Sequence, residues 1–218
     1  MNSDTESALL VRRAQEMALP LGESECAALL RLLDELERAN AQFNLTAIRD
    51  RSGMLHKHLL DSLSIQPYLR GARVADVGTG AGFPGLPLAI LNPGRQFVLI
   101  EATGKKARFV AQTAQCLALR NVEVVHGRAE LYRPAEGFDI VIARALASLA
   151  DFVAYAGHLC APQGRLLAMK GRRPDEEIAA VPRAFEVRAV DRLKLPGLDD
   201  ERHLVELSPA KPHAARSG

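Results

Sequence analysis

The stretch VADVGTGAGFPG, residues 74–85, decides the fold. Four mostly apolar residues come first, a glycine-rich loop follows, and an apolar helical segment begins directly after the loop. Glycines at positions 78, 80, 82 and 85 let the backbone turn sharply and approach a ligand closely. This order of strand, loop and helix is typical of the first unit of a sheet that binds a ligand at its glycine loop.

The loop has two functional interpretations. From Gly80 it matches G-x-G-x-x-G, which is a weak sign of dinucleotide binding. From Asp76 it is an acidic residue followed by G-x-G-x-G, which suits S-adenosylmethionine better. That ligand has no pyrophosphate, and its sulfonium and ammonium groups are positive. A turn that merely joins strand to helix is the simplest alternative, but four glycines would then cost folding entropy for no purpose.

Downstream of Gly71, short β-like runs alternate with helical segments. Such alternation predicts an α/β, Rossmann-like sheet that is mostly parallel and covered on both faces. The last two β-like runs have no helix after them, so we expect an antiparallel edge hairpin at the C-terminus. The predicted strands are 74–77, 97–100, 122–125, 138–142, 165–169, 185–192 and 203–207, and the predicted helices are 86–91, 105–119, 146–159 and 175–181.

Residues 1–68 are predicted to form an N-terminal helical extension. Ser24 to Asn40 carries apolar residues at three- and four-residue spacings, and residues 52–66 repeat the pattern until Pro67 ends it. Residues 44–50 are expected to form a loop. We therefore divide the chain into the extension (1–68), a Rossmann-like methyltransferase-type domain (69–208) and a tail expected to be disordered (209–218).

Composition narrows the function classes. The 218 residues carry a net charge of +2, with 7 Lys/Arg against 10 Asp/Glu in residues 1–68 and 21 against 16 in the remainder. A modestly basic body is compatible with an RNA substrate. Aromatic residues are 5% and Trp is absent, which does not favour an aromatic stacking platform. Three scattered cysteines, no signal peptide and no membrane-length apolar run predict a cytoplasmic protein without disulfides.

Two further strand ends carry residues suited to a nucleoside. Glu101 closes the second predicted strand, where a carboxylate can hold ribose hydroxyls. The third predicted strand runs into Gly127-Arg128-Ala129-Glu130, where backbone groups at Ala129 and Glu130 can meet an adenine edge. Together with the glycine loop, these positions predict an S-adenosylmethionine site that includes Gly78, Gly80, Gly82 and Glu101.

With these residues in view, the chain resembles the bacterial glucose-inhibited division protein B family, the ribosomal RNA small-subunit guanine-N7 methyltransferase G. The resemblance covers most of the chain in order, and one minor departure is Glu101, where relatives can have Asp. The glycine loop is common to many methyltransferases, whereas its combination with His58–Ser62 and Arg144-Ala145 is more specific. The matching segments are Asn44–Thr46, His58–Ser62, Asp76–Gly85, Gly104–Lys106, Gly127–Glu130, Ile142–Ala145, Met169–Gly171 and Glu201–Leu204.

The resemblance implies a set of functional residues. Cofactor contacts are expected at Gly78, Phe83, Ala129, Glu130 and Arg144. Catalytic or active-site roles are expected at Arg144, His58 and Asn44, and RNA contacts at Lys105, Arg128, Lys170 and Arg202. The implied partner is small-subunit (16S) ribosomal RNA or the ribosomal subunit, and we expect a monomer that binds no metal and no membrane.

The chemistry of guanine N7 fits this sequence. Its in-plane lone pair attacks a methyl sulfonium without losing a proton, so the reaction needs positioning and no general base. After the fourth predicted strand stands Ala143-Arg144-Ala145, and not the Asn/Asp-Pro-Pro-aromatic motif of exocyclic-amine methyltransferases. Ribose 2′-O methylation, an NAD(P)-dependent oxidoreductase and a non-catalytic RNA-binding module remain as alternatives.

Overall fold

The computed structural model describes residues 3–145 and 148–210. These residues contain a seven-stranded sheet with the strand order β3-β2-β1-β4-β5-β7-β6. The first five strands run parallel, and β7 is antiparallel to both β5 and β6. The strands are β1 (Arg73–Val77), β2 (Gln96–Glu101), β3 (Val122–His126), β4 (Phe138–Arg144), β5 (Cys160–Lys170), β6 (Phe185–Arg192) and β7 (His203–Pro209). The predicted fold class, including the C-terminal edge hairpin, is confirmed.

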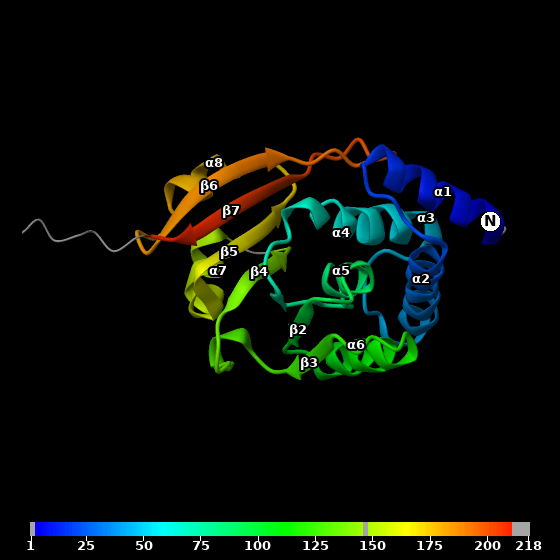
Figure 1. The fold of residues 1–218 in the computed structure, drawn as a ribbon, viewed down its shortest axis with the longest axis horizontal. Coiled ribbons are helices and arrows are strands. Elements are labelled where there is room, and N and C mark those ends of the chain that lie inside the picture. The colour runs from blue at the N-terminus through cyan, green and yellow to red at the C-terminus, as the bar shows by residue number, and fades with distance from the viewer. Residues whose placement is uncertain (1–2, 146–147, 211–218) are drawn as a thin grey trace, which may run out of the picture.

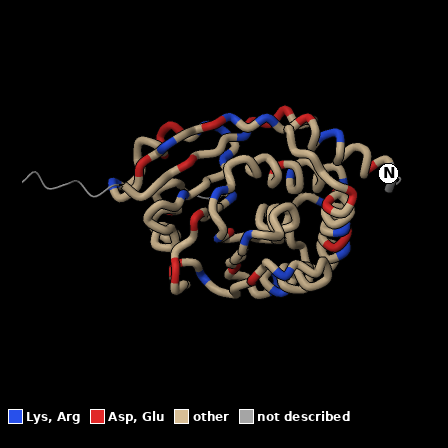
Figure 2. Tube along the Cα trace, viewed as in Figure 1, with Lys and Arg blue, Asp and Glu red and all other residues tan. Residues whose placement is uncertain are grey.

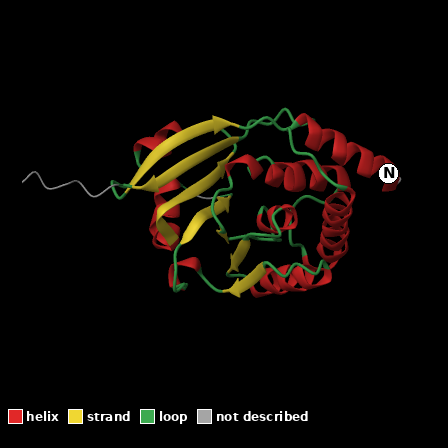
Figure 3. Ribbon diagram, viewed as in Figure 1, coloured by secondary structure: helices red, strands yellow, loops and turns green. Residues whose placement is uncertain are grey.

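Helices cover both faces of the sheet (Figures 1 and 3). The N-terminal helices share one hydrophobic core with α5, α6 and one sheet face, and α7 packs on the other face. The α-helices are α1 (Ser3–Glu16), α2 (Glu23–Phe43), α3 (Arg51–Met54), α4 (Asp61–Leu63), α5 (Gly85–Leu91), α6 (Gly104–Cys116), α7 (Leu149–Ala156) and α8 (Asp175–Ala179). None of the helices within the described ranges is long and apolar enough to cross a membrane.

Side-chain alternation along the central strands explains the two-sided core. In β2, Phe97 and Leu99 belong to the core under the N-terminal helices, whereas Val98 and Ile100 belong to the core under α7. Successive residues of a strand point to opposite faces, so a strand covered on both sides is apolar at most of its positions. This is why the parallel strands could be recognised as short, mostly apolar runs.

The N-terminal part departs from the expected pair of simple helices. The first predicted helix matches α2, but the second is split into α3, a π-helical segment at Leu55–Leu60, α4 and a short 3₁₀ turn at Gln66–Tyr68. A π-helical segment carries one extra residue per turn and is frequent at functional sites. The division of the chain at residue 68 stays a prediction, although both parts contribute to one shared core.

Two expectations fall partly outside the described residues. The helix predicted from Leu146 begins in residues 146–147, which are not described, and α7 is seen from Leu149 onward. Of the tail expected to be disordered (209–218), residues 211–218 also lie outside the described ranges, whereas Pro209 belongs to β7 and the Ala210 N–H donates to the Ala184 carbonyl at 2.8 Å.

Candidate active site

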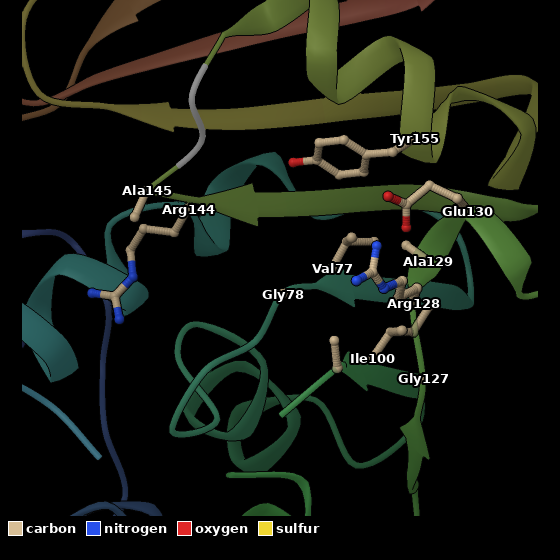
Figure 4. Close-up of a pocket in the computed structure, with 11 residues that line it drawn as sticks. Val77, Gly78, Ile100, Gly127, Arg128, Ala129, Glu130, Arg144, Ala145 and Tyr155 are labelled. Atoms are coloured by element: carbon tan, nitrogen blue, oxygen red, sulfur yellow. The ribbon is translucent and has the colours of Figure 1, made fainter. Parts of the chain in front are cut away.

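A cavity of about 400 Å³ lies at the carboxyl ends of the central strands. The strand order reverses between β1 and β4, and ligands of open α/β sheets bind at this switch point. Figure 4 shows the labelled residues around the cavity, with Arg128 and Glu130 on one side and Arg144 on the other. The lining residues are Val77, Gly78, Ile100, Ala102, Gly127, Arg128, Ala129, Glu130, Arg144, Ala145 and Tyr155.

The glycine loop adopts a backbone that side chains rarely allow. Gly78, Gly80 and Gly82 have φ angles of 66°, 63° and 88°. This left-handed region is open to glycine at little cost. At Gly82 a Cβ would in addition overlap the Leu86 side chain, so α5 packs directly on the loop. Of the three glycines predicted to contact the cofactor, Gly78 lines the cavity and Gly80 and Gly82 do not, and all three cofactor contacts stay predictions.

Asp76 holds the loop from below. Its side chain is fully buried, and its Oδ2 accepts hydrogen bonds from the Thr79 hydroxyl at 2.5 Å and the Gly85 N–H at 2.8 Å. Burial raises the pKa of Asp76 to about 6, because desolvation penalises the carboxylate more than these bonds favour it. Asp76 does not line the cavity, so it shapes the loop from behind.

Glu101 braces the loop from the neighbouring strand. Its carboxylate accepts hydrogen bonds from the Gly80 N–H at 2.9 Å and the Thr103 N–H at 2.7 Å, and the residue is 6% exposed. The residues on either side of it, Ile100 and Ala102, line the cavity. The predicted ribose contact stays a prediction, and the structure adds a bracing role that the sequence did not suggest.

A second cavity of about 390 Å³ adjoins the first. Arg144 and Ala145 line both cavities, and we call the second one the acceptor pocket. Ala145 has a φ of 56°, which is unusual for a residue with a Cβ and is the kind of strain found at functional sites. The acceptor pocket is lined by Ile48, Lys57, His58, Asp61, Arg144, Ala145, Met169, Lys170, Gly171 and Arg202.

A buried carboxylate organises the acceptor pocket. Asp61 is 3% exposed and binds two arginines, with Arg144 Nη1 at 3.3 Å from Oδ2 and Arg202 Nε at 3.0 Å from Oδ1. Arg144 also donates to the Lys57 carbonyl at 3.1 Å, so its guanidinium points toward the N-terminal helices (Figure 4). The two arginines come from β4 and from the residue before β7, and the carboxylate fixes them relative to each other.

His58 is held in one tautomer. The Arg144 guanidinium can only donate, so His58 Nδ1 accepts from it at 3.3 Å and the ring proton lies on Nε2. Nε2 then donates to Thr46 Oγ1 at 2.8 Å, and the ring stacks on Phe83 with centroids 5.1 Å apart. Desolvation and the adjacent Arg144 lower the pKa of His58 to about 4. His58 is therefore neutral at physiological pH.

The residues predicted to contact RNA are dispersed. Arg202 and Lys170 line the acceptor pocket and Arg128 lines the first cavity, whereas Lys105 lies in a separate groove against the end of α2. The side chain of Lys170 is 9% exposed and its ammonium lies 2.7 Å from Glu177, so it is not an open surface cation. Their RNA contacts stay predictions.

Asn44 lies outside both cavities. It caps the C-terminus of α2 with a φ of 48°, its side chain is exposed, and its Oδ1 accepts from Arg49 at 3.1 Å. The residue of that segment that reaches the site is Thr46, through His58. The predicted active-site role of Asn44 has no contact to support it in this structure.

Sequence reasoning missed three residues. Asp61 and Thr46 both stand in quoted motifs, but only the fold shows that they anchor Arg144, Arg202 and His58. Tyr155 of α7 lines the first cavity, but in the sequence it could not be distinguished from a core residue of the predicted helix 146–159. Across the described ranges no cluster of three or more potential metal ligands occurs.

Two solved methyltransferase structures have a similar fold. The glycopeptide N-methyltransferase MtfA in complex with S-adenosyl-L-methionine aligns with a TM-score of 0.62 and 12% identity, over 71% of this chain and 88% of that one. A SAM-dependent methyltransferase from Aquifex aeolicus aligns with a TM-score of 0.55 and 19% identity, over 71% and 92%. At these identities the likeness shows the fold, which is that of S-adenosylmethionine-dependent methyltransferases.

Sequence relatives narrow the class. A sequence model of the GidB family, described as rRNA small subunit methyltransferase G, matches residues 25–205. The Ribosomal RNA small subunit methyltransferase G of Nitrosococcus oceani is 50% identical over 195 residues, which cover 89% of this chain and 91% of that protein. The protein of the same name from Aeromonas salmonicida is 44% identical over 90% of this chain and 95% of its own length. The chain belongs to this methyltransferase family.

Proposed function

We propose that the protein transfers the methyl group of S-adenosylmethionine to N7 of a guanine in small-subunit ribosomal RNA. The observation that carries this proposal is the pair of adjoining cavities that share Arg144 and Ala145. The first suits the cofactor and the second the acceptor base, so the methyl group would pass beside Arg144. The names of the relatives, which specify small-subunit ribosomal RNA, support the choice of substrate.

The cofactor would lie across the carboxyl ends of β1 to β4. Gly78 allows close approach of the ligand to the loop, and Ala129 and Glu130 offer groups to the adenine. Glu101 sits next to the cavity and has lone pairs left for ribose hydroxyls beyond its two backbone bonds. Gly80, Gly82 and Phe83 act behind this surface by fixing the loop and the His58 ring.

Methyl transfer to guanine N7 requires no general base, and His58 is poorly suited to act as one. Both ring nitrogens of His58 are engaged, by Arg144 and Thr46, and its pKa of about 4 makes it a poor proton acceptor at neutral pH. S-adenosylmethionine held in the first cavity would supply the methyl carbon to the guanine N7 lone pair, and its sulfur would keep the electron pair of the carbon–sulfur bond that breaks. His58 positions Arg144, and catalysis consists of aligning the two reactants.

The Asp61 carboxylate suits the movement of positive charge from the cofactor to the guanine during methyl transfer. Methyl transfer leaves a cationic guanine and neutralises the sulfonium, so positive charge moves toward the acceptor pocket. Two uncompensated guanidinium groups there would oppose that movement. The Asp61 carboxylate lies between Arg144 and Arg202 and offsets part of their charge. The pocket thus keeps planar donors for the base while limiting repulsion of the product.

Two measurements test this function. Calorimetric titration should show binding of S-adenosylhomocysteine and none of NAD or NADP, which separates the proposal from the oxidoreductase alternative. Label from methyl-labelled cofactor should then appear in small-subunit RNA incubated as particles with the protein. Cofactor binding without any transfer would favour the non-catalytic RNA-binding alternative. We further propose that the protein works in the cytoplasm. We also propose that it is a monomer, since one chain supplies both cavities.

A further inference from the structure

A third cavity lies away from the two already described. The C-terminal end of α2 and the first turns of α6 enclose about 480 Å³, which we call the α2–α6 groove. The two helices run in opposite directions, because Arg31 in the middle of α2 donates to the carbonyl of Cys116 at the end of α6, whereas Lys105 Nζ at the start of α6 donates to the carbonyl of Phe43 at the end of α2, at 2.9 Å. Residues lining the groove include Arg38, Gln42, Phe43, Lys105, Arg108 and Phe109.

The groove exposes an aromatic ring. Phe43 is 51% exposed, and among the described residues it is one of two large hydrophobic side chains that are exposed to this extent. Phe43 ends α2, and the bond from Lys105 to its carbonyl fixes its backbone. An aromatic ring left in water at a fixed position forgoes the free energy of burial, which a stacking partner would recover.

Positive charge surrounds this ring. Lys105 and Arg108 are exposed on the first turns of α6, where Lys and Arg positions appear in Figure 2. Arg38 is paired with Glu35, but within the described ranges no hydrogen bond or ion pair engages the side chain of Arg108. The described lining residues include no Asp or Glu. This combination is complementary to a phosphate beside a planar base.

Each of the two chain segments that line the groove leads within a few residues to a residue that lines one of the active-site cavities. Ala102, three residues before Lys105, lines the cofactor cavity. Ile48, five residues after Phe43, lines the acceptor pocket, and five residues span at most about 18 Å. An RNA segment with one base in the acceptor pocket would therefore bring nearby nucleotides to the groove.

We propose that the α2–α6 groove binds an unpaired nucleotide of the RNA substrate close in sequence or space to the reacting guanine. Its base stacks on Phe43, and its phosphate contacts Lys105 and Arg108. The inference rests on the proposed function, since it assigns part of the same RNA to a second subsite. Composition did not favour an extended aromatic platform, and of the two phenylalanines that line the groove only Phe43 is exposed, since Phe109 is buried.

Methyl transfer to small subunits tests the groove. Phe43→Ala should raise KM for the subunit about tenfold, as expected for the loss of one base stack. Phe43→Tyr should retain the wild-type KM, because the ring remains. Arg108→Ala should lower the slope of log affinity against log salt by about 0.7, as expected for the loss of one phosphate contact on a single strand. Arg12→Ala, which removes an exposed arginine on α1, is the matched control.

The outcomes separate this inference from the proposed function. Absence of transfer by the wild type refutes the proposed function. If the wild type transfers methyl groups normally and both Phe43→Ala and Arg108→Ala behave like Arg12→Ala, only the nucleotide-binding role of the groove is refuted. Equal impairment of Phe43→Tyr and Phe43→Ala overturns the stacking contact. Binding to protein-free small-subunit RNA should weaken in the same variants, and an effect confined to assembled subunits would assign the groove to a ribosomal protein. Unchanged affinity for S-adenosylhomocysteine shows that the variants are folded.

Discussion

Replacing Asp61 with Asn tests how the acceptor pocket is organised. The carboxylate holds Arg202 at 3.0 Å and Arg144 at 3.3 Å, and each arginine side chain is 22% exposed. Hydrogen bonds to charged groups contribute about 1.5–3 kcal/mol each. The longer bond lies at the weak end, and partly exposed guanidinium groups recover some hydration. We therefore expect the free energy of unfolding to fall by about 2–3 kcal/mol in total.

This loss is measurable by thermal denaturation. For a chain of this size, about 2–3 kcal/mol corresponds to a decrease in Tm of about 4–12 °C. The kcat should fall by more than the unfolded fraction of the variant accounts for, because Arg144 would lose its orientation between the two cavities. Small misplacements of this kind can reduce rates by about 100-fold. The assay is transfer of labelled methyl to small subunits at saturating cofactor, at a temperature where the variant is folded.

A matched control separates positioning from stability. Glu206→Gln removes a comparable ion pair, Arg165–Glu206 at 2.9 Å, which joins β5 to β7 away from both active-site cavities. Glu206→Gln should lower Tm modestly and leave kcat unchanged. Arg202→Ala combined with Asp61→Asn should cost less than the sum of the two single changes, because the residues share one interaction. If Asp61→Asn retains the kcat of Glu206→Gln, the proposed role of Asp61 is wrong.

Three further predictions concern the cofactor loop and pH. Glu101→Ala should weaken S-adenosylhomocysteine binding by about 1.5–3 kcal/mol in calorimetry, because Gly80 and Thr103 lose their acceptor, and unchanged affinity in a folded variant refutes this. Gly82→Ala should abolish cofactor binding and lower Tm, since φ is 88° and a Cβ overlaps Leu86; normal binding would contradict the loop assignment. The pKa of His58 is lowered from 6.5 to about 4 in the folded protein, so between these pH values the unfolded chain binds a proton at His58 and the folded chain does not. The free energy of unfolding should therefore be unaffected by this group above pH 6.5 and should fall toward pH 4, by up to about 3 kcal/mol. Urea denaturation of wild type and His58→Asn across this range should show the difference between them shrinking as pH falls, and a constant difference would refute it.

Much of the fold could be predicted from the sequence because its strands are covered on both faces. The run 97–100 has no polar interruption, the run 138–142 has one, Asp139, and the glycine loop fixes where the first strand ends. The π-helical segment at Leu55–Leu60 could not be predicted, because six residues are too few for the period of their apolar side chains to distinguish a π-helix from an α-helix.

The candidate site was harder to predict because its contacts join distant parts of the chain. Asp61 and Arg144 are 83 residues apart, and Asp61 and Arg202 are 141 apart. An acidic residue on an amphipathic helix resembles a solvent-exposed one until the fold buries it. Asn44, predicted at the site from the resemblance, instead caps α2, where a left-handed backbone suits asparagine.

The atom of the RNA that receives the methyl group can be identified directly. Small subunits from cells that lack this protein would be incubated with the purified protein and methyl-labelled S-adenosylmethionine, and their RNA digested to nucleosides. We expect the label to elute with 7-methylguanosine, and chemical cleavage at N7-methylated guanine to cut the RNA at one position. Label on a ribose 2′-hydroxyl or on an exocyclic nitrogen would contradict it.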